Sequence, residues 1–226
     1  MVANPTIVIA DDHPLFRVAL KGTLENQFDQ PNLVEAEDFA SLQEKLESTR
    51  DINLILLDLH MPGAEGFSAL VFLIAQYPHI PVMIVSAHEE PEIMRRAVDH
   101  GASGFLPKSA PLEDMAEALT TVLNGELWLP EGTPDTVATE EELNVADALA
   151  NLTPQQFRVA TMVSQGLLNK QIAYELNVTE ATIKAHMTEI FRKLGVHSRT
   201  QAAVALSQMA VNPSVSLEEF RKNQAG

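Results

Sequence analysis

Short apolar runs alternate with amphipathic stretches over the first 124 residues of the chain. The amphipathic stretches show helical spacing of their apolar positions over residues 14–26, 38–48, 66–76, 91–100 and 111–124. Five strands that alternate with five helices predict an α/β fold with a five-stranded parallel sheet and helices on both faces. Near-continuous apolar strands fit a sheet that is buried on both sides. The predicted strands are TIVIA (6–10), LVEA (33–36), LILLD (54–58), PVMIVS (81–86) and GFLP (104–107).

The pattern changes after residue 124. Residues 125–150 contain Pro130, Gly132 and Pro134 followed by an acidic cluster, which predicts a linker with a short helix around residues 140–149. Residues 151–212 show helical spacing only, with helices expected over 154–166, 169–176, 180–194 and 199–209. A tight turn at 177–178 joins the second of these helices to the third, so the second part is expected to be an all-α, four-helix domain with a helix-turn-helix. Residues 213–226 are expected to form a C-terminal tail.

Several predicted helix ends carry residues with a strong positional preference. Thr153 and Gln156 have the spacing of a capping box, in which each side chain bonds the backbone amide of the other. The helix over 180–194 is expected to be capped by Thr179 and closed by Gly195. Three prolines are suited to the first turn of a helix, where a missing amide hydrogen costs nothing. They are Pro14, Pro91 and Pro111.

The charge is divided unevenly along the chain. A net charge of −16 argues against a simple nucleic-acid binder. Residues 1–150, however, have 7 Lys and Arg against 26 Asp and Glu, whereas residues 151–226 have 8 against 5. The mildly basic second part can approach phosphates, and the acidic first part must have a different partner.

The chain has no cysteine, which excludes disulfides and thiolate metal sites and implies no oxidising compartment. Its longest apolar runs are too short to span a bilayer, and its first residues lack the pattern of a secretory signal. We therefore expect a cytoplasmic protein with no membrane partner.

Five polar residues end or follow the predicted strands. The carboxyl ends of parallel strands meet at one edge of an open α/β sheet, where ligands bind. Three carboxylates gathered there would repel one another unless a hard cation such as Mg²⁺ lay among them. One carboxylate could then attack phosphorus, while a lysine and a hydroxyl stabilise the phosphoryl oxygens. The residues are Asp11, Asp12, Asp58, Ser86 and Lys108.

Each of these residues also has an ordinary structural explanation. Asp12 could cap the helix that begins at Pro14, and Asp58 could form a turn. Ser86 and Lys108, taken singly, could be solvated loop residues. Their coincidence at matching strand ends favours a common site.

Four segments carry a resemblance to a known family. IADDHPLFR (9–17), LLDLHMPGAEG (56–66), VMIVSAH (82–88) and GASGFLPKSA (101–110) resemble the signature segments of the receiver domain of response regulators, in order and in spacing. The resemblance covers about residues 5–124 and implies a flavodoxin/CheY-like (βα)5 receiver domain over residues 1–124. It also implies that Asp58 is the phosphoacceptor.

The same resemblance assigns roles to the neighbouring residues. Asp11, Asp12, Asp58 and the backbone carbonyl of His60 would hold Mg²⁺. Ser86 and Lys108 would contact the phosphoryl group. Phe105 would act with Ser86 as a conformational switch, although the residues alone indicate only core packing for Phe105.

The helix over 180–194 has the pattern of a DNA-recognition helix. Such a helix buries one apolar stripe and presents the opposite face to base edges, with cations near the flanking phosphates. The alternative is an amphipathic helix with a solvated charged face, but its place in a helix-turn-helix of the basic region favours DNA. The buried stripe is Ile183, Met187, Ile190, Phe191 and Leu194, and the candidate DNA contacts are Lys170, Thr182, Lys184, Ala185, Thr188 and Arg192.

A second resemblance covers residues 151–206. The segments NKQIA (169–173), TIKAH (182–186), KLGV (193–196) and SRTQA (198–202) resemble the LuxR-type DNA-binding domain, which we expect over 151–212. The resemblance implies that Lys184, Ala185 and Thr188 face bases and that dimers form through the last helix. Together the two halves resemble a NarL/FixJ-type response regulator.

Two residues depart from the LuxR-type pattern. Gln156 stands where that family usually has Glu, which puts in doubt an ion pair with Arg199 while leaving the capping role intact. Leu168 replaces a small polar residue before Asn169, which would remove a helix cap. We expect a cost on the order of 1 kcal/mol from the first change.

The sequence therefore predicts a two-component response regulator rather than an enzyme. It would accept a phosphoryl group from a histidine kinase and bind paired half-sites in double-stranded DNA as a homodimer. One alternative is a regulator with the same parts that works without phosphorylation. A second is a Mg²⁺-dependent phosphatase with an aspartyl nucleophile, which His60 disfavours because such enzymes usually carry Asp two positions after the nucleophile.

Overall fold

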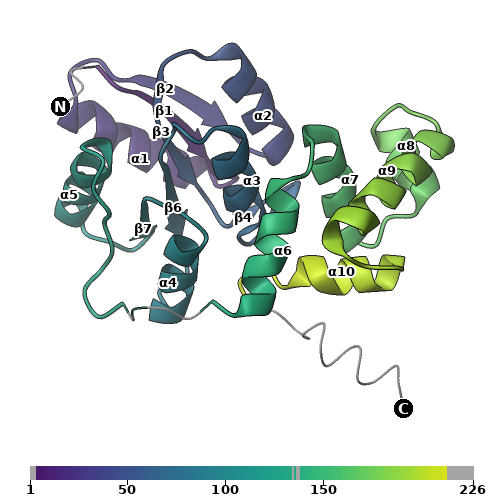
Figure 1. Cartoon of the computed structure of the whole chain (residues 1–226). Helices are drawn as coiled ribbons and strands as arrows, with labels where there is room; N and C mark the ends of the chain where they lie inside the picture. The colour runs from purple at the N-terminus through teal and green to yellow at the C-terminus, as the bar shows by residue number, and fades with distance from the viewer. Residues whose placement is uncertain (1–3, 134, 136–137, 213–226) are drawn as a thin grey trace.

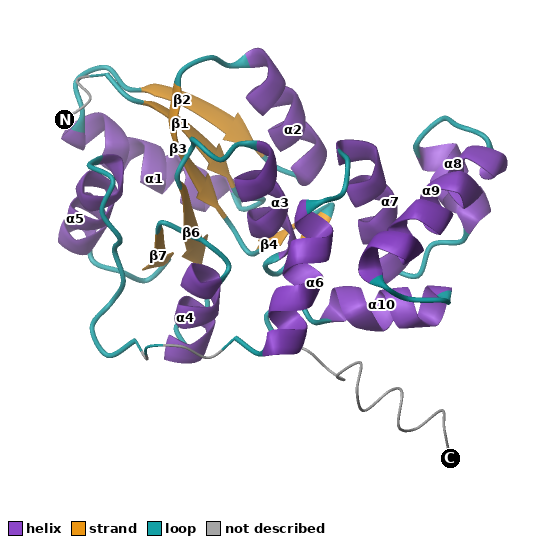
Figure 2. Cartoon of the chain, viewed as in Figure 1, coloured by secondary structure: helices purple, strands orange, loops and turns teal. Residues whose placement is uncertain are grey.

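The computed structural model describes residues 4–133, 135 and 138–212, so Pro134 and the expected tail over 213–226 lie outside the described residues. The chain begins with a five-stranded parallel sheet in the order β2-β1-β3-β6-β7, confirming the predicted α/β fold (Figures 1 and 2). The strands are β1 (Thr6–Ala10), β2 (Asn32–Ala36), β3 (Ile52–Leu57), β6 (Val82–Ser86) and β7 (Gly104–Pro107).

Helices cover both faces of the sheet. Side chains alternate along β1, so that Ile7 and Ile9 join one buried cluster while Val8 and Ala10 join another. The first cluster is closed by α1 (Pro14–Gln27) and α5 (Leu112–Leu123). The second is closed by α2 (Phe39–Ser48), α3 (Ser68–Gln76) and α4 (Pro91–Asp99).

The predicted element boundaries agree with the structure to within two residues, and two of the differences have a clear local cause. The helix expected over 66–76 begins at Ser68, because a short hairpin of β4 (His60–Met61) and β5 (Ala64–Glu65) precedes it and Gly66 has a left-handed φ of 55°. Pro111 is the N-cap residue of α5 and lies outside the helix, whereas Pro14 and Pro91 stand inside the first turn as expected.

The second part of the chain is helical, as predicted. The helix expected around residues 140–149 is α6 (Glu140–Ala150), and it is followed by α7 (Pro154–Ser164), α8 (Asn169–Glu175), α9 (Glu180–Leu194) and α10 (Arg199–Ser207). The turn between α8 and α9 contains Asn177 at a left-handed φ of 51°. Thr153 and Gln156 form the predicted capping box, and Gly195 closes α9 with a φ of 65°.

The two domains pack against each other. Helix α6 lies between the sheet domain and α7–α10, where it contacts α3 (Figure 1). The ring of Phe157 on α7 lies 5.0 Å from that of Phe39 on α2 and 4.4 Å from that of Phe72 on α3, measured between ring centroids. These rings belong to one contiguous buried cluster that crosses the domain boundary. The packing therefore fixes the relative placement of the domains.

Phe157 is a sharp test of that packing. Phe157→Ala should destabilise the protein by about 3–5 kcal/mol, because it leaves a cavity beside the rings of Phe39 and Phe72 in addition to losing buried area. Denaturant unfolding followed by circular dichroism measures the change. Tyr174→Ala is the control, since this aromatic side chain is 84% exposed and its loss should cost less than about 0.5 kcal/mol.

Candidate functional site

Three of the five predicted site residues meet at the carboxyl edge of the sheet. Asp11 follows β1, Asp58 follows β3 and Lys108 follows β7. The Lys108 Nζ lies 2.6 Å from Asp11 Oδ2 and 2.8 Å from Asp58 Oδ2, and both carboxylates are buried. The sheet topology thus brings together side chains that lie about fifty residues apart or more in the sequence.

Asp12 and His13 also belong to this cluster. The His13 Nδ1 lies 2.6 Å from Asp12 Oδ1, 3.3 Å from Asp11 Oδ1 and 3.9 Å from Asp58 Oδ2. His13 is not among the site residues predicted from the sequence, although its position directly after two aspartates could have suggested a role at the same edge.

The residues present fit a hard divalent cation. Asp11, Asp12, His13 and Asp58 each offer a ligand atom, and these atoms lie within 4.8 Å of one another. Asp11 Oδ2 and Asp12 Oδ1 are buried and accept no well-aligned hydrogen bond, although Lys108 and His13 lie against them. Carboxylate oxygens in this arrangement suit Mg²⁺, which prefers oxygen ligands.

The environment of Asp58 makes its ionised form costly. Burial raises the pKa of the Asp58 carboxyl above its usual range, and the negative charge of Asp11 raises it further. The hydrogen bond and positive charge of Lys108 oppose this rise, as does the His60 amide, which donates to Asp58 Oδ1 at 3.3 Å. A bound cation would favour the carboxylate form, because its charge adds to that of Lys108.

Ser86 and Phe105 lie behind this edge, and both are completely buried. The His88 amide donates to Ser86 Oγ at 3.3 Å. The imidazole of His88 lies against that of His60, with ring centroids 5.0 Å apart, and the backbone amide of His60 bonds to Asp58. The switch role of Ser86 and Phe105, and the metal-ligand role of the His60 carbonyl, stay predictions.

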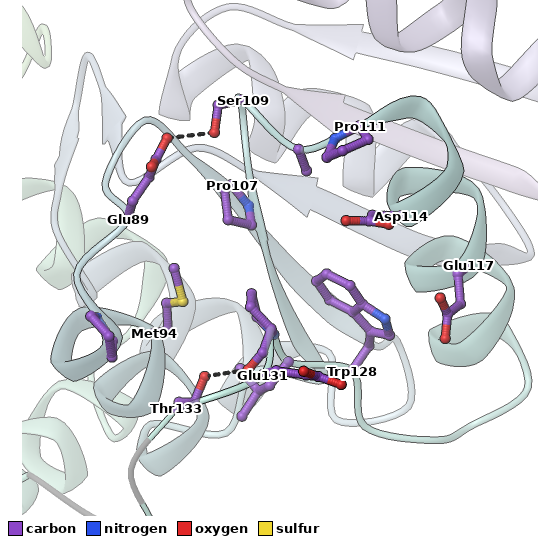
Figure 3. A pocket seen from close by; sticks show the side chains of 14 residues that line it. Glu89, Met94, Pro107, Ser109, Pro111, Asp114, Glu117, Trp128, Glu131 and Thr133 are labelled. Atoms are coloured by element: carbon purple, nitrogen blue, oxygen red, sulfur yellow. Dashed lines mark hydrogen bonds between the residues drawn. The ribbon is translucent and has the colours of Figure 1, made fainter.

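A groove of about 640 Å³ adjoins the site, between α4, α5 and the chain after α5 (Figure 3). The Ser109 hydroxyl donates to the Glu89 carboxylate across one end of it. At the other end, the Trp128 carbonyl accepts a hydrogen bond from the Phe105 amide at 3.2 Å. The chain that leads to the second domain is therefore bonded to the strand that carries Phe105.

The predicted DNA-binding face of α9 is accessible. Lys184, Ala185, Thr188 and Arg192 are exposed, as is Lys170 on α8. Thr182 is half-buried, and its backbone amide donates to Thr179 Oγ1 at 3.2 Å, as the N-terminal capping of α9 requires. The predicted apolar stripe faces inward, with Ile183, Met187 and Ile190 buried and Phe191 and Leu194 half-buried.

The two departures from the LuxR-type pattern have local consequences. Gln156 accepts a hydrogen bond from Lys193 Nζ at 2.6 Å, while Arg199 donates to Asn169 Oδ1 at 3.1 Å and to the Leu167 carbonyl. Leu168 has no polar side chain to accept from the first amides of α8, but Gln171 still supplies the reciprocal half of a capping box by accepting from the Leu168 amide at 2.8 Å.

Comparison with known sequences agrees with both halves of this structure. Residues 7–120 match the response regulator receiver domain, and residues 150–206 match the luxR family of bacterial regulatory proteins. The chain is 36% identical to the nitrate/nitrite response regulator protein NarL of Escherichia coli over 208 residues, covering 90% of this chain and 95% of NarL. The chain belongs to the NarL/FixJ-type response regulators.

Other relatives and one solved structure extend the comparison. The glycerol metabolism activator of Pseudomonas putida is 39% identical over 209 residues, covering 88% of this chain and 93% of the relative. The structure of RcsB from Salmonella enterica serovar Typhimurium bound to the promoter P1flhDC has a TM-score of 0.54 at 26% identity, covering 92% of this chain and all of that one. This response regulator therefore combines a receiver with a LuxR-type DNA-binding domain and regulates transcription in a phosphorylation-dependent manner. Among its described residues no helix is long and apolar enough to cross a bilayer.

Replacing Asp58 should not weaken the fold. Since the folded-state pKa of Asp58 is raised, its ionised form lowers stability at any pH above that pKa, and acidification through the pKa removes this cost. Asp58→Asn should therefore melt at a higher temperature than the wild type at neutral pH, with the difference shrinking as the pH falls. Thermal unfolding at several pH values measures this. A lower melting temperature for the variant at neutral pH would contradict the electrostatic account.

Proposed function

We propose that this response regulator accepts a phosphoryl group on Asp58 from a histidine kinase and then binds paired DNA half-sites as a homodimer. The observation that carries the proposal is the position of Asp58, buried between Lys108 on one side and Asp11, Asp12 and His13 on the other. The cluster can hold a cation and a phosphoryl group next to the same carboxylate.

The chain's own residues divide the work of phosphotransfer. A carboxylate oxygen of Asp58 forms a bond to phosphorus while the phosphorus–nitrogen bond of the kinase's phosphohistidine breaks, which leaves an acyl phosphate and a free imidazole. Lys108 and Ser86 stabilise the phosphoryl oxygens. Mg²⁺, when bound, supplies further positive charge for those oxygens, and Asp11, Asp12, Asp58 and the His60 carbonyl would hold it. The protein thus assists its own modification without being an enzyme.

The DNA-binding half reads the site with the exposed face of α9. Lys184, Ala185 and Thr188 face base edges in the major groove, while Lys170, Thr182 and Arg192 contact phosphates. A twofold pair of such domains fits half-sites about one helical turn apart. The basic charge of residues 151–226 supports this assignment.

Phosphorylation of Asp58 is tested with a small-molecule phosphodonor. Wild-type protein incubated with acetyl phosphate and Mg²⁺ should gain one phosphoryl group by mass spectrometry, and the label should be lost in base. Asp58→Asn should gain none, because the amide cannot attack phosphorus. Removing Mg²⁺ with a chelator should also suppress the label. Equal labelling of variant and wild type would refute Asp58 as the acceptor, and no label on the wild type would favour the regulator that works without phosphorylation.

Recognition by α9 is tested by Lys184→Ala. Specific DNA binding should weaken roughly five- to a hundredfold, because one base-edge contact is lost in the major groove. Fluorescence anisotropy with a selected operator and with unrelated DNA separates specific from general binding. Lys21→Ala is the matched control, since Lys21 pairs with Glu35 on the receiver and should leave DNA affinity unchanged. Unchanged affinity for Lys184→Ala would show that the helix is misassigned.

A further inference from the structure

Two histidines lie together where the segment after β3 meets the segment after β6. His60 begins β4, two residues after Asp58, and His88 stands two residues after Ser86. The centroids of their rings are 5.0 Å apart, and the ring planes are inclined by 31°. His60 is exposed and the side chain of His88 is 25% exposed, so solvent reaches both rings. We call His60 and His88 the imidazole pair.

The distance between the two rings agrees with that of two imidazoles on one metal ion. In a tetrahedral zinc site each Zn–N bond is about 2.1 Å long, which places the two imidazole centroids about 3 Å from the ion and about 5 Å from each other. The imidazole pair already has this separation. Because His60 is exposed, its ring can turn a nitrogen toward an ion without disturbing the core.

A carboxylate fixes the tautomer of His88. The His88 Nδ1 lies 3.2 Å from Glu90 Oε2. An ionised carboxylate only accepts hydrogen bonds, so Nδ1 carries the hydrogen and Nε2 keeps the lone pair that a metal ion needs. The Glu89 amide donates to the same Glu90 oxygen at 3.1 Å and holds it in place. Metal-binding histidines usually have such a carboxylate partner, because it orients the ring and makes the free nitrogen a stronger ligand.

The imidazole pair and the acidic cluster prefer different metals. Asp11, Asp12 and Asp58 offer carboxylate oxygens, which suit a hard cation such as Mg²⁺. Imidazole nitrogens suit borderline transition-metal ions such as Zn²⁺, Ni²⁺ and Cu²⁺. Water would fill the remaining positions on an ion held by two imidazoles, so we expect weaker binding than at a structural zinc site with four protein ligands.

Both histidines are bonded through their backbones to residues of the proposed phosphorylation site. The His60 amide donates to Asp58 Oδ1 at 3.3 Å, and the His88 amide donates to Ser86 Oγ at 3.3 Å. An ion bound to both rings would join the segment after β3 to the segment after β6. Ser86 could then not move toward a phosphoryl group on Asp58 without straining the bonds to the metal.

We infer that the imidazole pair, oriented by Glu90, is a second metal site that binds a borderline transition-metal ion such as Zn²⁺, and that this ion slows phosphorylation of Asp58. The inference rests on the proposed function for the effect on phosphorylation, whereas binding of the ion can be measured without a phosphoryl donor.

The first experiment measures Zn²⁺ binding by the untagged, full-length protein. Isothermal titration calorimetry is carried out in excess Mg²⁺, which fills the acidic cluster, and the wild type should bind one Zn²⁺ per chain. His60→Ala and His88→Ala should each lose this binding, because each removes one of the two ligands. Glu90→Gln should weaken it by about tenfold, since the carboxylate partner of a metal-binding histidine is worth about ten- to a hundredfold in affinity.

Two other histidines provide matched controls. His79 is exposed and precedes β6, so it lies at the opposite edge of the sheet, and His79→Ala should bind Zn²⁺ as the wild type does. His13 lies against the acidic carboxylates. Zn²⁺ binding that is lost in His13→Ala but retained in His60→Ala would place the ion in the acidic cluster and overturn the second site. No binding to folded wild type, checked by circular dichroism, would overturn it as well.

A spectroscopic measurement identifies the ligands directly. Cu²⁺ serves as the probe, because it binds nitrogen ligands more tightly than Zn²⁺ and is paramagnetic. With one equivalent of Cu²⁺ in excess Mg²⁺, electron spin echo envelope modulation should show nitrogen coupling from two imidazoles in the wild type and from one in His60→Ala. The same spectrum in both proteins would exclude His60 as a ligand and overturn the site.

The second experiment asks whether the bound ion affects phosphorylation. Labelling by acetyl phosphate is compared with and without saturating Zn²⁺, at constant Mg²⁺, for each protein separately. Zn²⁺ should slow labelling of the wild type by about fivefold or more and leave the rate of His88→Ala unchanged. Equal slowing in both proteins would show that Zn²⁺ acts at the acidic cluster, and no slowing of the wild type would show that the ion is without effect; either result would overturn the regulatory role. If the wild type took no label even without Zn²⁺, the proposed function would fail, and calorimetry would still decide the metal site.

Discussion

The receiver depends on keeping three carboxylates close together beyond the ends of parallel strands. Such a group is unstable by itself, because burial and mutual repulsion both oppose ionisation. Lys108 reduces that cost by touching Asp11 and Asp58 at once, and His13 lies against all three carboxylates. Because Lys108 supplies one positive charge against three carboxylates, the cluster suits a divalent cation and, with that cation bound, phosphoryl transfer.

A buried carboxylate that needs positively charged partners is also found at the domain interface. Glu142 on α6 is buried because Arg96 and His100 of the receiver accompany it, and Arg96 also donates to backbone carbonyls at the end of the DNA-binding domain. Aromatic packing around Phe157 provides an apolar contact that does not depend on charge. The interface therefore combines a non-directional hydrophobic contact with a directional one, and a small displacement of α4 weakens the directional part first.

Much of the site could be predicted from the sequence, since Asp11, Asp58 and Lys108 stand at strand ends that a parallel sheet must bring together. Helix caps such as that formed by Thr153 and Gln156 could also be predicted, because capping depends on residues three positions apart. His13 was missed as a neighbour of the carboxylates because a helix start explains it locally. The partners of Arg96 could not be predicted, because they lie more than forty residues away and include backbone carbonyls.

The sequence by itself determined the two folds, the acidic cluster and the exposed face of α9, since each follows from periodicity or from short-range spacing. Only the tertiary structure decided how the domains meet, which charged groups are buried between them and that α9 stays exposed. The physical reason is that local patterns fix the elements and their buried faces, whereas an interface between two finished domains depends on long-range shape and on pairing between distant charges.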